Sequence, residues 1–305
     1  MSEKKTIFTL ADHPLTPSGV GTQSKYVIEA LLKTGRYKFI CLGGAMKHNN
    51  YNLVKVDPYG EDWIIYPVDG YGNPEYKPMK TEEWGDDWII YPVDGYGNQD
   101  MVRSIIRAER PDMLWFMTDP RFWPWLWAID NEIRAHMPMV YYHVWDNKPY
   151  PYFNKPYYES NDHIAKVTDD IVKTVAPDVP STYLPDAVDG KLFFKIPKSE
   201  IAKHREESGL PKDKIIFFWN NRNARRKQSG TLIFWFKEFL DKVGHDKAML
   251  IMHTEPSDPN GQDLNAIIKS LELGDGQVMI STQKVPPQSL NVIYNMVDCT
   301  INISD

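Results

Sequence analysis

Two patterns of hydrophobic and polar positions alternate along the chain. Short apolar runs are typical of buried parallel strands, and longer segments with apolar residues at every third or fourth position are typical of helices. At the start of the chain, the pattern predicts a strand over 6–10, a loop over 11–22, a helix over 23–34 and a strand over 37–42. This order is that of a doubly wound α/β fold.

The same alternation continues to the end of the chain and predicts two domains, over 1–185 and 215–305, joined by a linker and helix over 186–214. In the first domain, further strands are predicted at 89–93, 113–117, 139–143, 164–168 and 182–184, helices at 101–108, 122–136 and 169–175, and a loop at 148–162. After a helix at 195–210, the second domain has predicted strands at 215–219, 248–253, 278–281 and 299–303 and helices at 231–240, 264–271 and 289–296.

One segment of the first domain is duplicated. The sequence DWIIYPVDGYGN occupies residues 62–73 and recurs unchanged at 87–98. Two copies are too few for a solenoid. The second copy leads directly into the helix at 101–108, so we expect its apolar run to fill the strand position of the main sheet. The first copy is then expected in an insertion or at a sheet edge.

Composition narrows the class of protein. The chain has 305 residues, 42% of them hydrophobic and 25% charged, with a net charge of −6. Two α/β domains fit this length, and the net negative charge does not favour a general nucleic-acid binder. Cys41 and Cys299 lie in apolar runs and are predicted to be buried free thiols. The sequence shows no signal peptide and no apolar stretch of membrane-spanning length, so we expect a cytoplasmic protein.

A basic stretch follows the first strand of the second domain. Trp219–Gly230 contains four cationic side chains and lies between the strand at 215–219 and the helix at 231–240. Open α/β sheets bind ligands at this edge, and a helix N-terminus adds unpaired N–H groups. The stretch is therefore interpreted either as a diphosphate site or as a solvated basic turn.

Polar residues also follow several strands of the first domain. They are Asp12, His13, Asp119, His143 and Asp146. Each alone has a structural interpretation, but the carboxyl ends of parallel strands share one edge of a sheet, so together they favour a site.

Two glycines, Gly19 and Gly21, follow the first strand. They either let a ligand approach the backbone or form a plain tight turn. Their spacing is not the full dinucleotide fingerprint. His253 and Glu255 supply only two candidate metal ligands, too few to predict a metal site.

Several motifs stand in the order found in retaining glycosyltransferases of the GT-B fold, and the chain resembles family 4 of these enzymes (glycosyl transferases group 1). The resemblance is carried by the Gly-rich segment 18–23, by His143, by 184–189 with Phe193, by Asn221 and Arg222 with Lys227, and by 294–304.

The resemblance implies two Rossmann-like domains, which move a sugar from a nucleotide-diphosphate sugar of UDP or GDP type to a glycan, lipid or small-molecule acceptor bound between them. Anomeric configuration is retained, and no metal or other cofactor is expected. Cationic side chains stabilise the leaving diphosphate. The implied catalytic residues are His143, Arg222 and Lys227; the donor site comprises Gly19, Gly21, Asn221, Arg222 and Lys227, and the acceptor site Asp12, His13, Asp119 and Asp146.

The sequence departs from the family pattern at several positions. Asn221 replaces the usual glycine before Arg222, and the glycine after Lys227 is delayed to Gly230. The family's E-G-F-G segment and glutamate pair would follow Ser304, so we expect a second domain that lacks its C-terminal part. Either the sequence is a fragment, or an oligomer or a second chain completes the domain, or the protein is a degraded relative. Two alternatives stay open: a non-catalytic nucleotide- or sugar-binding relative, and a nucleotide-sugar epimerase.

Overall fold

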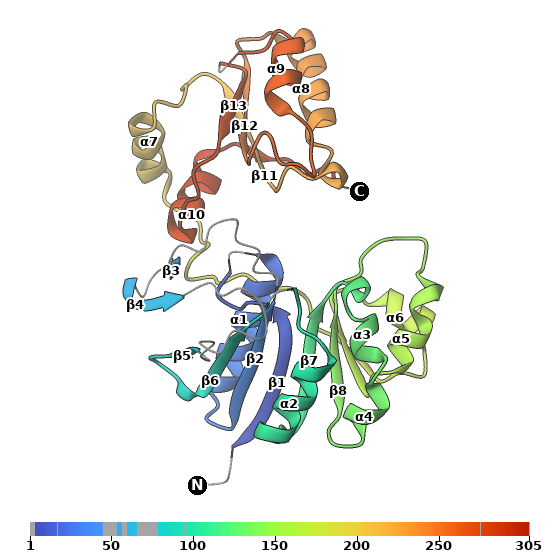
Figure 1. Ribbon diagram of the computed structural model, residues 1–305. Coiled ribbons are helices and arrows are strands. Elements are labelled where there is room, and N and C mark those ends of the chain that lie inside the picture. Colours follow the sequence, from blue (N-terminus) through green and yellow to red (C-terminus); the bar gives the residue numbers. More distant parts are fainter. Residues whose placement is uncertain are drawn as a thin grey trace. The chain divides into compact units, whose positions relative to one another are not determined.

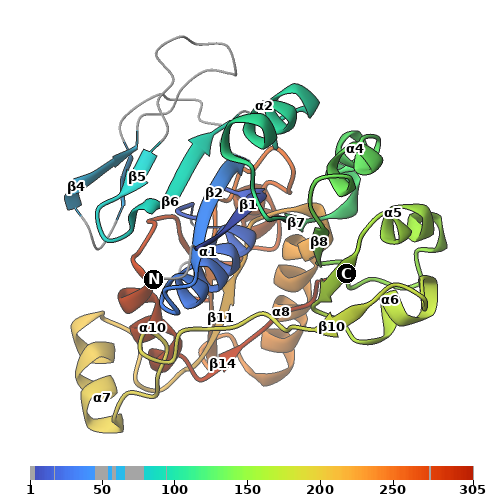
Figure 2. The same ribbon diagram turned by 90° about the horizontal axis from the view of Figure 1, so that it is seen from below.

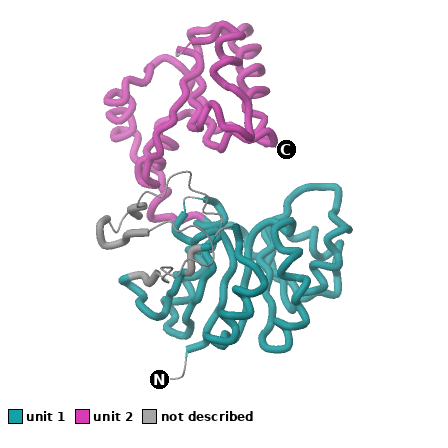
Figure 3. The backbone as a smooth tube through the Cα atoms, viewed as in Figure 1, with its two compact units in different colours: residues 1–187 teal, residues 188–305 magenta. Residues whose placement is uncertain are grey.

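The computed structural model describes residues 4–16, 18–44, 54–56, 60–65, 79–93, 95–274 and 276–304. The chain divides into two compact units, residues 1–187 and residues 188–305 (Figure 3). Each unit has its own sheet and its own hydrophobic core. No helix in the described ranges combines the length and the apolar character needed to cross a membrane.

Unit 1 is built on an eight-stranded sheet with the order β10-β9-β8-β7-β1-β2-β6-β5. All neighbouring strands are parallel except β5, which pairs antiparallel with β6 at the edge. The strands are β1 (Lys5–Asp12), β2 (Tyr37–Gly44), β5 (Met79–Thr81), β6 (Gly85–Pro92), β7 (Met113–Thr118), β8 (Met139–His143), β9 (His163–Lys166) and β10 (Ser181–Tyr183).

Helices cover both faces of this sheet. α1 (Gly19–Leu32) buries Ile28 and Leu32 in one apolar cluster with Phe39 and Trp88, and the remaining helices bury their apolar residues on the other face. Figure 2 shows α1 and α2 on opposite sides of β1 and β2. The other helices are α2 (Gln99–Glu109), α3 (Pro124–Trp127), α4 (Asp130–Arg134), α5 (Lys155–Glu159) and α6 (Asp170–Val175).

The predictions for the connections after β7 and after β8 are wrong. The single helix expected over 122–136 is a 3-10 turn (Pro120–Phe122) followed by the separate short helices α3 and α4. Pro124 lacks an N–H and cannot continue a helix, but it fits the first turn of a new one. The loop expected over 148–162 contains a 3-10 turn (Tyr152–Asn154) and α5, where Pro156 again occupies the first turn.

The prediction for the duplicated segment is confirmed. The second copy supplies most of β6, which pairs in parallel with β2 inside the main sheet. Residues 62–65 of the first copy belong to β4 (Gly60–Ile65), which pairs antiparallel with β3 (Val54–Val56) in a separate two-stranded sheet. The rest of the first copy lies outside the described residues.

Unit 2 contains a parallel sheet with the order β13-β12-β11-β14. α8 and α9 pack on one face, and α10 packs on the other (Figure 1). The α/β fold class with two doubly wound sheets is therefore confirmed. The strands are β11 (Ile215–Asn220), β12 (Ala248–His253), β13 (Val278–Ser281) and β14 (Cys299–Thr300), and the helices are α7 (Lys198–Glu207), α8 (Ser229–Val243), α9 (Leu264–Ser270) and α10 (Pro287–Met296).

The two cysteines differ in environment. Cys41 is buried in β2 as predicted, and burial raises the pKa of its thiol to about 12. Cys299 is exposed, so its predicted burial is wrong. β14 pairs only with β11 among the described strands, which leaves this side chain at the edge of the sheet.

Candidate functional site

The strand order of unit 1 reverses between β1 and β7. β1 is followed along the chain by β2 on one side, and the chain later returns to place β7 on the other side. Ligands of open α/β sheets bind outside the carboxyl ends of the strands at such a switch point. Asp12 ends β1, Thr118 ends β7 and His143 ends β8. These predicted strand-end positions therefore lie at one edge of the sheet.

Asp12 connects two loops at this edge. Its Oδ2 accepts a hydrogen bond from Ser18 Oγ at 2.6 Å, and its Oδ1 accepts one from Tyr96 OH at 2.8 Å. Burial, together with the Asp12 charge, raises the pKa of Tyr96, so the phenol keeps its proton as a donor. Sequence reasoning missed Tyr96, which occurs in the Gly-rich turn of the duplicated segment.

His13 is fully buried against the end of β2. Its Nδ1 accepts a hydrogen bond from Leu15 N–H at 3.2 Å. A Cβ atom at Gly43 would lie 2.6 Å from His13 Cδ2, so only glycine leaves room for the ring. In this conformation His13 shapes the loop after β1 and has no exposed surface for the predicted contact with an acceptor.

The predicted Gly-rich loop over 11–22 is partly helical, which corrects the sequence prediction. α1 begins at Gly19 because Ser18 caps it: Ser18 Oγ accepts a hydrogen bond from Gly21 N–H at 2.9 Å while donating to Asp12. Side-chain capping of this kind satisfies a backbone donor of the first turn. Gly19 and Gly21 therefore lie in the first turn of a helix beside Asp12.

The two glycines differ in a way that gives a matched test. A Cβ at Gly21 would lie 2.7 Å from both His13 O and Thr16 Oγ1, whereas a Cβ at Gly19 meets nothing within 4 Å. We expect Gly21→Ala to lower the free energy of unfolding by about 1–3 kcal/mol through overpacking. Gly19→Ala is expected to be neutral or stabilising by up to about 1 kcal/mol. Urea unfolding measures both, and equal effects would contradict this packing.

His143 is fully buried at the end of β8. Its Nε2 lies 2.6 Å from Tyr158 OH, and its Nδ1 has no hydrogen-bond partner among the described residues. Burial lowers the pKa of the imidazole to about 3, so the ring is neutral at pH 7. Asn154 Nδ2 donates to Tyr158 OH at 3.4 Å. Sequence reasoning missed Tyr158 and Asn154 because it assigned their segment to a loop.

This buried imidazole makes stability depend on pH in a defined direction. The pKa of His143 has its ordinary value of 6.5 in the unfolded chain and is about 3 in the folded chain. Between pH 3 and pH 6.5, His143 is therefore protonated only in the unfolded chain. Stability therefore falls as pH falls through this window, by about 1.4 kcal/mol per pH unit.

We expect His143→Gln to remove about 3 kcal/mol of the stability difference between pH 7 and pH 4.5. Urea unfolding of the wild type and the variant at both pH values measures the effect. The same difference in both proteins would show that His143 does not titrate in this way.

Asp119 and Asp146 are the predicted residues of this edge that reach the surface. Asp119 caps the following 3-10 turn and binds Arg121 Nε and Nη2 at 2.9 and 3.0 Å. Asp146 is exposed and forms no side-chain hydrogen bond or ion pair with the described residues. Thr118, next to Asp119, has a φ of 138°, which a β-branched residue rarely adopts. Backbone strain of this kind clusters at functional sites.

In unit 2 the strand order reverses between β11 and β14, and the basic stretch begins at the carboxyl end of β11. Arg222 donates from Nε to Asp258 Oδ2 at 2.7 Å and from Nη2 to Asp258 Oδ1 at 3.2 Å. The pair lowers the pKa of Asp258. The Arg222 side chain is 65% exposed. A guanidinium has five N–H groups. The two N–H groups of Nη1 and the second N–H of Nη2 therefore remain as donors that point away from Asp258.

Asn223, beside Arg222, holds this turn together from inside. Its side chain is fully buried and bonds with three residues. Nδ2 donates to Pro256 O and Gln262 O at 3.2 and 2.7 Å, and Oδ1 accepts from Ser229 Oγ and Gln262 N–H at 2.7 and 3.2 Å. The loop that carries Asp258 is thereby tied to the basic stretch.

The start of α8 differs from the sequence prediction of free N–H donors. Gly230 N–H already donates to Gln262 Oε1 at 2.8 Å. A Cβ at Gly230 would lie 2.7 Å from that oxygen, so the glycine serves this close contact. Sequence reasoning missed Asn223, Gln262 and Asp258, although Asn223 lies inside the stretch that it selected.

The other cations of the stretch form a 3-10 turn, Arg225–Lys227, before α8. Arg225 and Arg226 are exposed, and neither side chain forms an ion pair with the described residues. Lys227 is half-buried in the same turn. The surface beside Arg222 is therefore cationic, with Asp258 as the carboxylate that Arg222 engages.

The predicted donor set is divided between the units. Gly19 and Gly21 belong to unit 1, whereas Asn221, Arg222 and Lys227 belong to unit 2. Over the part of the chain that the structure describes, no group of three His, Cys, Asp or Glu side chains is placed to hold a metal ion. His253, considered above as a candidate ligand, has Nδ1 2.9 Å from Ser281 Oγ.

Comparison with known proteins supports the fold. No protein family and no curated protein matches the sequence. Among solved structures, the chain is similar to apo OtsA (10% identity, TM-score 0.63, covering 98% of this chain and 77% of that one). It is also similar to a trehalose-6-phosphate structure from E. coli with bound UDP-2-fluoro glucose (11%, TM-score 0.61, 98% and 78%). A third is a glycosyltransferase from Rickettsia africae (15%, TM-score 0.61, 99% and 73%). At these identities the likeness shows the GT-B fold.

Proposed function

We propose that this protein is a glycosyltransferase that moves a sugar from a nucleoside-diphosphate sugar of UDP or GDP type to an acceptor, with retention of anomeric configuration. The observation that carries the proposal is the Arg222 guanidinium, which Asp258 holds in place at the switch point of the unit 2 sheet. The motif order of the sequence and the GT-B fold support it, and one similar structure contains a UDP sugar.

The cationic turn suits the chemistry of a leaving diphosphate. When the bond between the sugar and the diphosphate breaks, negative charge develops on the phosphate oxygens. Arg222 offers its remaining N–H groups as a planar fork, and Lys227 offers a compact charge. Because Asp258 fixes the guanidinium beforehand, little reorganisation accompanies the reaction. A donor placed in this way contributes about 3–4 kcal/mol to transition-state stabilisation.

We assign acceptor recognition to the edge of unit 1. Asp146 is exposed and Asp119 is partly exposed beside Arg121, and their carboxylate oxygens can accept hydrogen bonds from hydroxyl groups such as those of a sugar. Asp12, His13 and His143 are buried and act by positioning: Asp12 holds Ser18 and Tyr96, and His143 holds Tyr158. Direct contact of His143 with a substrate, which the sequence suggests, requires a change in this conformation.

The test is an assay of the full chain with a panel of UDP and GDP sugars and simple sugar acceptors, following nucleoside diphosphate release and the anomeric configuration of the product. We expect release of one diphosphate that depends on the acceptor, with retained configuration. An altered donor sugar formed without any acceptor would instead identify an epimerase. Binding of a nucleotide sugar without turnover would identify a non-catalytic relative.

A further inference from the structure

A pocket lies at the opposite edge of the unit 1 sheet from Asp12 and His143. It has a volume of about 470 Å³ and occupies the space beside the C-terminal end of α2 and the segment after α4. These segments lead into β7 and β8, so the pocket is at the amino ends of the strands. Its lining residues are Ile106, Arg107, Arg110, Pro111, His136 and Met137.

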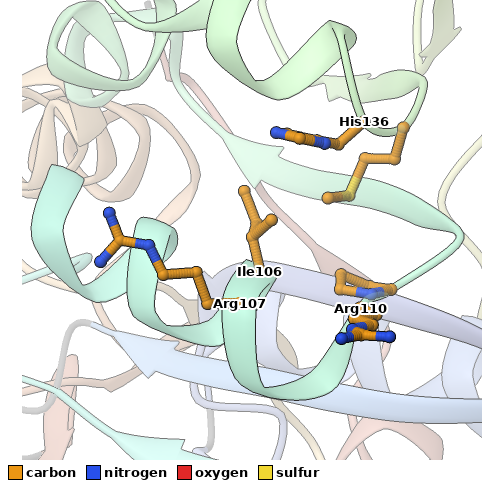
Figure 4. Close-up of a pocket in the computed structure, with 6 residues that line it drawn as sticks. Ile106, Arg107, Arg110 and His136 are labelled. Carbon is orange, nitrogen blue, oxygen red and sulfur yellow. The ribbon is translucent and has the colours of Figure 1, made fainter.

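The lining combines cationic and apolar groups. Figure 4 shows Ile106 among the side chains of Arg107, Arg110 and His136. All three basic side chains are exposed, and none of them has a hydrogen bond or ion pair with the described residues. Met137 and Pro111 are buried beside them. The pocket therefore pairs an apolar floor with three basic groups.

Two neighbouring carboxylates, Glu132 and Asp112, are engaged by cations outside the pocket. Glu132 accepts from Arg103 Nε and Nη2 at 2.8 and 2.9 Å. Asp112 accepts from Lys5 Nζ at 2.6 Å. No acidic residue lines the pocket itself. Its basic side chains are thus available to an anion from solution.

Arg110 occupies a backbone position that normally favours glycine. It follows α2 with φ 44° and ψ 56°, the left-handed conformation, and its N–H donates to Ile106 O at 3.1 Å. Glycine is the usual residue at this position of a helix end, because other residues are strained there. Arg107 lies in the last turn of α2, where a cation interacts favourably with the helix dipole. The left-handed conformation of Arg110, in contrast, does not serve the stability of α2.

We propose that this pocket binds a phosphorylated small molecule. Arg107 and Arg110 present guanidinium forks that match phosphate oxygens, and His136 adds a ring nitrogen. Ile106, Pro111 and Met137 contact the carbon part of the ligand. The volume falls within the range of about 300–1,000 Å³ that is typical of small-molecule sites. The site is separate from the proposed sugar-transfer chemistry and does not depend on it.

Inorganic pyrophosphate is the probe. Its binding is followed by NMR through the ring protons of His136, whose resonances are assigned by comparison with the His136→Gln variant. This readout separates the pocket from any pyrophosphate bound near Arg222. We expect the resonances of the His136 ring protons in the wild-type chain to shift in a saturable way as pyrophosphate is added. The affinity measured in this way should fall at high salt, because the basic groups are exposed.

Arg110→Gly keeps the variant folded, because glycine is the residue that this backbone conformation favours. We expect it to raise the melting temperature and to weaken pyrophosphate binding at His136 about tenfold or more. Arg107→Gln is expected to weaken binding similarly, and Arg36→Gln, at the same edge of the sheet but outside the pocket, to leave it unchanged. An unperturbed His136 in the wild type, or equal binding by wild type and Arg110→Gly, overturns the proposal.

Discussion

Arg222→Ala is expected to lower the rate of sugar transfer by about 10²–10³-fold while leaving the protein folded. The substitution removes the donors that face the developing charge of the diphosphate. Removal of one such donor typically lowers the rate by about this factor. In the ion pair with Asp258, the Arg222 side chain is 65% exposed and the Asp258 side chain 11% exposed, so the guanidinium is solvated. Such pairs contribute only about 0–1 kcal/mol to folding. Activity should therefore fall much more than stability.

Lys227→Ala is expected to act in the same direction, and Asp258→Asn to have an intermediate effect, because it loosens Arg222 without removing its charge. Lys212→Ala is the control, since Lys212 is an exposed lysine of unit 2 that pairs with Glu206. Initial rates with a saturating acceptor, together with urea unfolding, measure the set. Normal turnover in Arg222→Ala contradicts the assignment.

The second large effect concerns stability. Asn223→Ala is expected to lower the free energy of unfolding of unit 2 by about 3–5 kcal/mol. The change leaves Ser229 Oγ, Gln262 N–H and two carbonyl oxygens without their partner inside the protein, and each unsatisfied buried group costs about 1–3 kcal/mol. The total cost is smaller than the sum over these four groups, because some of them form hydrogen bonds with water after the loop relaxes.

Asn221→Ala is the matched control, since Asn221 is only half-buried in the same turn. We expect its effect to stay within about 0.5 kcal/mol. Chemical denaturation followed by fluorescence reports the difference, and comparable stability of the two variants means that the Asn223 network does not hold the turn.

The sequence is sufficient to place most strands. The strands predicted at 139–143, 248–253 and 278–281 coincide with β8, β12 and β13. Each is a compact apolar run with polar or turn-forming residues at its ends, which is the strongest pattern for a strand buried on both faces. The duplicated segment was also resolved correctly, because only one copy leads into a helix.

The wrong predictions concern features that depend on contacts between residues and strands in the folded chain. Pro124 starts a new helix inside an apolar stretch that looks continuous. The exposure of Cys299 depends on which strands flank β14, and periodicity does not encode sheet order. The start of α1 at Gly19 depends on Ser18, whose hydroxyl bonds with both Asp12 and Gly21.

The candidate sites show the same division. Strand ends could be recognised from sequence, so Asp12 and Arg222 were selected. Their partners could not be: Tyr96 lies 84 positions from Asp12, and Asp258 lies 36 positions from Arg222. Such pairs form only through the fold, and single-sequence patterns contain no signal for them.

The most direct test of the proposed function is a calorimetric titration of UDP, GDP and ADP into the full chain and into Arg222→Ala. The account predicts that one of these diphosphates binds to the wild type and that binding is at least about 10²-fold weaker in the variant. A folded wild-type chain that binds none of them, or a variant that binds as tightly as the wild type, would contradict the donor site at Arg222.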